Sequence, residues 1–183
     1  MNLIKITTKS YPIKIDLFYA KKKNFTGKKI YKKKNCYLHK DAIPYFEKTI
    51  GLADRLNYKI KIFDAFRPVE AQWKLWEHTP NENFIAHPEK GSPHSRGVAI
   101  DLTLINKNNY ELNMGTNFDN FSSKSSHGNI DISREAQKNR FILLGIMLAA
   151  GWDFYKKEWW HYQLFDSKKY KLIKNDMLIG PIM

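Results

Sequence analysis

The sequence predicts an α+β fold: a small, mainly antiparallel sheet packed against helices, in a single domain that spans residues 1–183. Candidate helices and strands follow one another without the regular strand–helix–strand rhythm that indicates a parallel sheet. The chain is long enough to bury a substantial core, and its 43% of hydrophobic and 14% of aromatic residues argue against global disorder.

The first predicted helix covers residues 41–56. Asp41 is a suitable N-cap, and Pro44 falls in the first turn, where a missing backbone N–H leaves no hydrogen bond unmade. Apolar residues recur at helical spacing at Ile43, Phe46, Ile50 and Leu52.

Two strands and a short helix are predicted in the middle of the chain. Residues 59–66 alternate apolar and polar side chains, and Pro68 ends that pattern. A short helix around Gln72 follows, and breakers then indicate a loop over residues 79–92. Residues 98–104 are rich in β-forming side chains and predict a buried strand.

The clearest helix lies near the C-terminus, after a polar and irregular stretch over residues 105–132. Ser133 is placed to cap its start and Gly151 to end it. Strands over residues 152–155 and 160–164, joined by a Lys-Lys turn, complete the predicted sheet. The residues expected to face the core from this helix are Phe141, Leu144 and Leu148.

The net charge of +13 raises the question of a nucleic-acid partner, but its distribution argues against a specific one. Eight lysines without an acidic residue fall between Lys21 and Lys34, and the rest of the chain carries only +5. Such a run is typical of a solvated loop or strand edge, although weak attraction to polyanions stays open. No recognised nucleic-acid motif accompanies the charge.

Location and redox state are also indicated. No stretch approaches the roughly 20 apolar residues of a membrane span. The N-terminal residues 1–15 lack the apolar region of a signal peptide, so we expect a cytoplasmic protein, or a periplasmic one if the chain is a processed form. The single cysteine, Cys36, fits a reducing compartment and is expected to be a structural thiol.

Two imidazoles, one carboxylate and a spare glutamate stand out: His94, Asp101, His161 and Glu158. Three protein ligands, an open position for water and a nearby base make up a catalytic zinc site. Asp101 interrupts an apolar strand, where a buried carboxylate must be paired, hydrogen-bonded or bound to metal. The histidines at positions 39, 78 and 87 have no such context and are expected to be structural or exposed.

The spacing of these residues needs a particular local structure. His94 and Asp101 would face opposite ways on one straight strand, so they converge only if the chain turns between them, which Gly97 permits. Glu158 and His161 share a face on a helix, but their surroundings predict a strand, so a bend or bulge is required there as well.

The pattern Ser92-x-His94-x-x-Gly97-x-Ala99-x-Asp101, followed by Glu158-x-Trp160-His161, resembles the signature of the zinc D,D-peptidases. Further segments resemble the VanX-type D-alanyl-D-alanine dipeptidases of that group in order and spacing, from about residue 12 to residue 165. These are Asp16-Leu17-x-Tyr19-Ala20, Asn24-Phe25-Thr26-Gly27, Asp64-Ala65-Phe66-Arg67-Pro68 and Met114-Gly115-Thr116-x-Phe118-Asp119.

The resemblance implies a role for each catalytic position. His94, Asp101 and His161 would hold one zinc ion per chain, which would make hydroxide available near neutral pH. Glu158 would act as the general base that takes the water proton and passes it to the leaving amine. Arg67 would stabilise the oxyanion with its forked donors.

The resemblance also implies a substrate site. Tyr19 and Asp119 would meet the ammonium group of a small D-amino-acid dipeptide, and Ser92, together with Tyr31, would bind its carboxylate. One departure is visible: Pro93 stands where the family pattern carries a small hydroxyl residue, and proline removes an N–H donor beside the carboxylate site.

The function expected from this resemblance is hydrolysis of D-Ala-D-Ala, in peptidoglycan precursor or D-alanine metabolism. Both D-alanine recycling and resistance to antibiotics that bind the D-Ala-D-Ala terminus are compatible with it. One alternative is a D,D- or L,D-carboxypeptidase that trims peptidoglycan stem peptides, which predicts an open cleft. Another is a non-catalytic binding module on the same zinc fold, which predicts loss of Glu158 or Arg67, and both are present.

Overall fold

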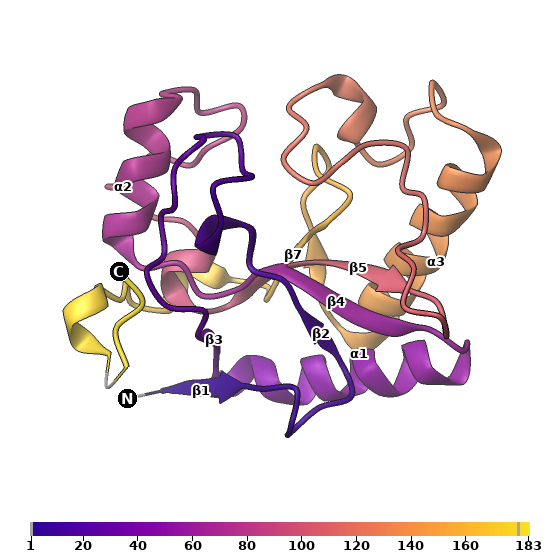
Figure 1. Ribbon diagram of the computed structural model, residues 1–183, viewed down its shortest axis with the longest axis horizontal. Helices are drawn as coiled ribbons and strands as arrows, with labels where there is room; N and C mark the ends of the chain where they lie inside the picture. Colours follow the sequence, from indigo (N-terminus) through magenta and orange to yellow (C-terminus); the bar gives the residue numbers. More distant parts are fainter. Residues whose placement is uncertain (1, 179) are drawn as a thin grey trace.

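A computed structural model describes residues 2–178 and 180–183 of the protein (Figure 1). The main sheet in this part of the chain has five strands in the order β2-β4-β5-β7-β6, and only the β2–β4 pair is parallel. The fold class is therefore confirmed as α+β with a mainly antiparallel sheet. The strands are β2 (Lys14–Ile15), β4 (Lys59–Asp64), β5 (Ala99–Ile105), β6 (Asp153–Phe154) and β7 (His161–Gln163).

A second, two-stranded sheet pairs β1 (Leu3–Ile6) with β3 (Cys36–His39) in antiparallel register. It is joined to the main sheet region by a hydrogen bond of 2.7 Å from the His39 amide to the Gly97 carbonyl. Cys36 is buried in this small sheet, and burial raises the pKa of its thiol well above the usual range, as expected of a structural cysteine.

In the described residues, three α-helices surround the sheet: α1 (Ile43–Arg55), α2 (Val69–His78) and α3 (Arg134–Ala150). Figure 1 shows α1 running along one side of the sheet next to the lower end of α3, with α2 and the long connecting segments on the other side. Short 3-10 helices occur at η1 (Phe18–Ala20), η2 (Lys40–Ala42), η3 (His94–Arg96), η4 (Ser123–Ser125), η5 (Ser167–Lys169) and η6 (Asn175–Met177).

The start of α1 differs from the sequence-based expectation. Asp41 does not cap the helix, because η2 precedes it and α1 itself begins at Ile43 with Pro44 in its first turn. The backbone N–H of Asp41 instead donates to Nδ1 of His39 at 3.2 Å. His39 thus caps η2, and α1 itself has no side-chain cap.

The ends of α3 are as predicted, but its buried face is not. The Ser133 hydroxyl accepts the Ala136 N–H, and Gly151 ends the helix with a φ of 102°. Phe141 is 55% exposed and Leu148 is 44% exposed, so the prediction that these two face the core is wrong. Leu144, the third residue of the predicted stripe, is half-buried and packs against the core. The buried residues of this helix are Ala136, Asn139, Arg140, Leu143, Ile146, Met147 and Ala150.

Two polar residues explain that difference. Asn139 and Arg140 lie on the buried face of α3, where their side chains donate to the carbonyls of Asn113 and Met114. These hydrogen bonds pair polar atoms that would otherwise be costly to bury, and of the Arg140 guanidinium only Nη2 has no partner among the described residues. Both helix faces carry apolar residues at helical spacing, and the polar pair faces inward because its partners lie there.

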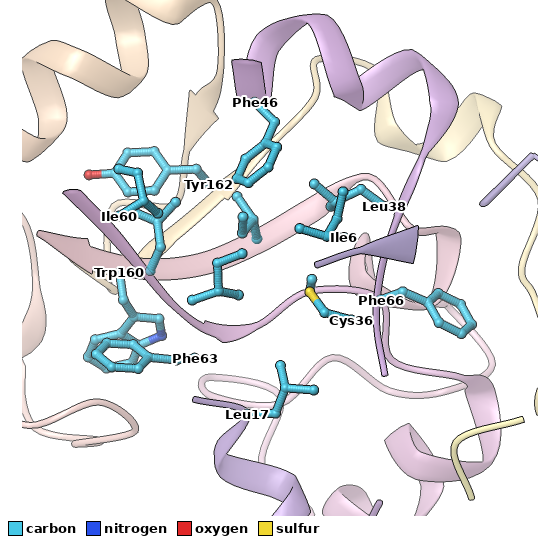
Figure 2. Close-up of a cluster of buried hydrophobic side chains, with 14 of the residues drawn as sticks. Ile6, Leu17, Cys36, Leu38, Phe46, Ile60, Phe63, Phe66, Trp160 and Tyr162 are labelled. Atoms are coloured by element: carbon cyan, nitrogen blue, oxygen red, sulfur yellow. The ribbon is translucent and has the colours of Figure 1, made fainter. Parts of the chain in front are cut away.

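The core is continuous around the main sheet. Figure 2 shows Phe46 pointing from α1 toward Ile60 and Tyr162, while Phe63 and Trp160 lie together on the opposite side of the strands. The lysine-rich segment over residues 21–34 forms a loop in which all the lysines but Lys21 are exposed, which confirms the solvated interpretation. None of the helices in the described ranges is long and apolar enough to cross a membrane.

Candidate metal centre and active site

The chain turns between His94 and Asp101, as the spacing requires. His94 lies on η3, and Gly97 ends that turn in the left-handed region with a φ of 73°, so that β5 begins at Ala99. Asp101 then lies directly opposite His161, the first residue of β7, in the antiparallel ladder. Two neighbouring strands and one glycine-ended turn therefore bring the three side chains together.

The three side chains converge on one point, and their candidate ligand atoms lie within 4.8 Å of one another. His94 Nε2 is 3.1 Å from His161 Nδ1 and 3.3 Å from Asp101 Oδ2, and His161 Nδ1 is 3.0 Å from Asp101 Oδ1. All three residues are buried. Two nitrogens and one carboxylate oxygen form a donor set that suits a divalent transition metal.

The far nitrogen of each imidazole faces an acceptor. His94 Nδ1 lies 2.6 Å from the Ala65 carbonyl, and His161 Nε2 lies 3.1 Å from Oε1 of Gln163. Each far nitrogen can donate only if it carries the ring proton, which leaves the lone pairs of His94 Nε2 and His161 Nδ1 facing each other. A cation between them resolves that opposition, and metal-binding histidines in proteins are oriented in this manner. The residues present therefore fit a metal.

Asp101 is held in its charged form. Burial by itself raises the pKa of this carboxyl, but the adjacent His94 and His161 side chains outweigh burial and hold the pKa well below its usual range. A charged carboxylate is the form that ligates metal.

Glu158 lies in the turn between β6 and β7, and not on a strand, so the turn supplies the bend that the sequence requires. Its backbone N–H donates to Tyr155, and its carbonyl accepts the His161 N–H at 3.3 Å. The side chain is half-buried and lines the same cavity as His94, Asp101 and His161, the three candidate ligands that we call the metal cluster. Glu158 is not one of these three ligands. Burial raises the pKa of Glu158 to about 7.

Arg67 is fixed by two side chains. Its Nε donates to Asp64 Oδ2 at 2.9 Å, and Nη1 donates to Gln72 Oε1 at 2.9 Å. Nη2 lies 2.8 Å from the same Asp64 oxygen and 3.7 Å from Oδ2 of Asp101. The guanidinium also stacks over the ring of Tyr19 at 4.8 Å. Arg67 is thus a rigid, buried cation beside the metal cluster.

The structure corrects the expectation for Tyr31. This residue is fully buried, its side chain is absent from the cavity wall, and its hydroxyl donates to Asp64 Oδ1 at 2.9 Å. Tyr31 therefore helps to hold Asp64, which in turn holds Arg67, and its hydroxyl faces Asp64 and not the cavity. The buried Asp64 was part of a recognised sequence segment, but its position next to Arg67 gave no indication of this bridging role.

The other predicted substrate residues do line the cavity. The Tyr19 hydroxyl donates a hydrogen bond of 3.0 Å to Asp119 Oδ2. The backbone of Asp119 has a φ of 58°, which residues other than glycine rarely adopt. Burial raises the pKa of the Asp119 carboxyl well above its usual range. The Ser92 hydroxyl accepts the His94 N–H at 3.2 Å, beside Pro93.

One cavity of about 220 Å³ joins these groups. It is smaller than the roughly 300–1,000 Å³ pockets that hold drug-sized ligands. The metal cluster, Glu158 and Arg67 line it together with the pair Tyr19 and Asp119. The arrangement places a carboxylate, a fixed cation and three candidate metal ligands around a space for a small molecule.

Comparison with known proteins assigns the chain to a family. The family model described as D-Ala-D-Ala dipeptidase matches residues 3–177. This chain belongs to the D-Ala-D-Ala dipeptidase family. It is 39% identical to the D-alanyl-D-alanine dipeptidase of Escherichia coli K12 over 161 residues, which cover 88% of this chain and 83% of that protein. The dipeptidase of Enterococcus faecalis is 33% identical over 176 residues, covering 85% and 87%.

Membership of the dipeptidase family makes this protein a peptidase. The resemblance recognised from the sequence motifs is thereby confirmed. A slighter structural likeness, with a TM-score of 0.47 and 14% identity, relates 73% of the chain to 75% of a mutant vancomycin resistance D,D-pentapeptidase VanY in complex with Zn(II). Gln163 and Gln72, which contact His161 and Arg67, could not be predicted from the sequence because neither belongs to a motif that signals chemistry.

Proposed function

We propose that this protein is a zinc-dependent peptidase that hydrolyses D-Ala-D-Ala to two molecules of D-alanine. The observation that carries the proposal is the cluster of His94, Asp101 and His161, with both imidazoles oriented by acceptors, in one small cavity with Glu158 and Arg67. The dipeptidase names of the relatives support the substrate, and the donor set supports zinc.

Each catalytic side chain has a distinct task. His94, Asp101 and His161 would hold one zinc ion per chain, which would lower the pKa of a bound water molecule to about 7 and polarise the peptide carbonyl. Glu158 takes a proton from the attacking water and transfers it to the amine nitrogen as the C–N bond breaks. Arg67 stabilises the negative charge that develops on the carbonyl oxygen, and Asp64 and Gln72 keep its donors in place.

A free dipeptide carries an ammonium and a carboxylate, and the cavity wall offers a partner for each. Asp119, with Tyr19 as its hydrogen-bond partner, receives the substrate ammonium, and Ser92 contributes to the carboxylate site. The salt link formed with an ammonium offsets the burial that raises the Asp119 pKa. This recognition requires an unmodified amino group close to the scissile bond.

A stem-peptide carboxypeptidase is the alternative within the same chemistry. It needs an open cleft for a longer chain, whereas the metal cluster here lies in a cavity of about 220 Å³. We therefore favour the free dipeptide as substrate. A cytoplasmic location, where dipeptide precursors are made, and the absence of a specific nucleic-acid partner remain predictions from the sequence.

The test compares free D-Ala-D-Ala with N-acetyl-D-Ala-D-Ala and with a stem pentapeptide that ends in D-Ala-D-Ala, using purified, zinc-loaded protein. We expect D-alanine release from the free dipeptide only. Faster release from the acetylated or pentapeptide substrate would favour the carboxypeptidase. If protein with full zinc occupancy releases no D-alanine from any of the three substrates, the proposed function is contradicted.

A further inference from the structure

Three phenylalanines from separate segments meet at the outer side of the catalytic cavity. Phe25 comes from the lysine-rich loop, Phe84 from the segment after α2, and Phe121 from the stretch that follows Asp119. The ring centroid of Phe121 is 5.0 Å from that of Phe25 and 4.9 Å from that of Phe84. All three line the cavity and are half-buried, so part of each ring faces solvent. We call Phe25, Phe84 and Phe121 the aromatic rim.

The segment 81–86, which carries Phe84, is attached on both sides of the cavity. On one side, Asn83 Oδ1 accepts a hydrogen bond of 3.0 Å from Lys157 Nζ, next to Glu158. On the other, Phe84 stacks on Phe121 with an interplanar angle of 27°. The Ala86 carbonyl also accepts the side-chain amide of Gln72 at 2.8 Å. Segment 81–86 therefore connects the turn that carries Glu158 with the stretch that follows Asp119.

The aromatic rim adjoins the part of the cavity assigned to the substrate ammonium. Phe121 follows Asp119 by two residues, and the ring centroid of Phe25 is 6.2 Å from that of Tyr19. A peptide extended at its amino end would have to continue past the ammonium position into these rings. The rim is thus a steric barrier on the amino side of the substrate, and it acts in addition to the charge preference of Asp119.

We propose that segment 81–86 and the aromatic rim form a lid that restricts the enzyme to dipeptides by blocking amino-terminal extensions. This inference rests on the proposed dipeptidase function and assigns its length selectivity to Phe84 and Phe121. The buried Ile85 and the Gln72–Ala86 hydrogen bond hold one end of the lid. The rest is held by ring contacts and the exposed Lys157–Asn83 hydrogen bond, and these contacts can open to admit substrate.

The experiment measures kcat/KM for free D-Ala-D-Ala, for N-acetyl-D-Ala-D-Ala and for Gly-D-Ala-D-Ala. The last substrate keeps a positive charge but moves it outward by one residue, which separates the steric barrier from the charge preference. The variants are Phe84→Ala and Phe121→Ala, with Phe141→Ala as the matched control because Phe141 is exposed on α3 and lies outside the cavity wall. Zinc content and far-UV circular dichroism are recorded for each.

The expected result is a ratio of Gly-D-Ala-D-Ala to D-Ala-D-Ala hydrolysis that rises about tenfold or more in both rim variants and stays at the wild-type value in Phe141→Ala. If an alanine variant fails to fold, Phe84→Leu replaces it and is expected to shift the ratio in the same direction. If the rim variants are folded, zinc-loaded and active on the dipeptide but show unchanged ratios, the proposed lid is overturned and the proposed function still stands. Wild-type protein that cleaves no substrate would overturn the proposed function and the lid with it.

Discussion

Asp101 and His161 lie directly opposite each other on antiparallel strands, with 3.0 Å between the carboxylate Oδ1 and the imidazole Nδ1. The main-chain ladder of β5 and β7 fixes that pairing, so two of the three proposed metal ligands are positioned by the sheet itself. The third, His94, depends on a short turn that Gly97 ends. Changes at the turn should therefore affect the metal site without disrupting the sheet.

Gly97→Ala is predicted to weaken zinc binding and to destabilise the protein by about 2 kcal/mol, since a left-handed residue with a Cβ is strained. The added Cβ would also lie 2.5 Å from Leu3 Cδ2 and 3.3 Å from the His39 amide nitrogen. Urea unfolding and zinc titration measure the two effects. Gly145→Ala is the control, because its Cβ meets nothing within 4 Å and a helical alanine is favoured. Equal stability of the two variants would contradict the claim that position 97 requires a residue without a Cβ.

Gln163→Leu is predicted to lower zinc affinity roughly 10- to 100-fold while leaving the fold intact, because the His161 ring loses the acceptor that orients it. Competition with a chelator of known affinity measures the change. Gln137→Leu, at a half-buried position on α3 outside the cavity wall, is the matched control. Wild-type affinity in Gln163→Leu would show that the ring needs no such partner.

Glu158→Gln is predicted to retain zinc and to lose about 10²- to 10⁴-fold in kcat for D-Ala-D-Ala, since an amide cannot take up the water proton. Zinc analysis alongside steady-state kinetics separates the two properties. Glu89→Gln, at an exposed position, should keep wild-type turnover. Turnover near the wild-type level in Glu158→Gln would remove this residue from the role of base.

His127 is predicted to make stability depend on pH. Burial, together with the Arg140 guanidinium, lowers the pKa of His127 to about 4, whereas an unfolded histidine has a pKa of about 6.5. The unfolded state therefore takes up the proton first, so this contribution is complete above pH 6.5 and is lost as the pH falls toward 4. The free energy of unfolding falls by about 3 kcal/mol at most through this one group.

The measurement is the free energy of urea unfolding at pH 4.5 and 7.5, for wild type and His127→Gln, with chelator present throughout so that metal does not contribute. The pH dependence of the variant should be weaker than that of the wild type. Parallel pH profiles for the two proteins would contradict the assignment to His127.

Features that depend on local chemistry could be predicted from the sequence. The caps of α3 at Ser133 and Gly151 follow from side-chain and backbone preferences within a few residues. The turn before β5 was predictable because alternation along a strand forbids His94 and Asp101 from meeting otherwise. The family motifs then identified the residues that the structure brings into one cavity.

Features that depend on distant partners could not be predicted. Phe141 and Leu148 face outward because Asn139 and Arg140 find carbonyl partners on the buried side of α3, and nothing in the helix itself reveals those partners. Tyr31 binds Asp64, which is 33 positions away, and so was mistaken for a substrate contact. The pairing of β1 with β3 likewise joins short segments without a strong local signal.

The most direct measurement is D-alanine release from free D-Ala-D-Ala by the protein as purified, after removal of metal with a chelator, and after stepwise restoration of zinc. We predict that release is lost with the metal and returns in proportion to zinc occupancy, reaching its limit at one ion per chain. Dipeptide hydrolysis that continues unchanged in verified metal-free protein would contradict it.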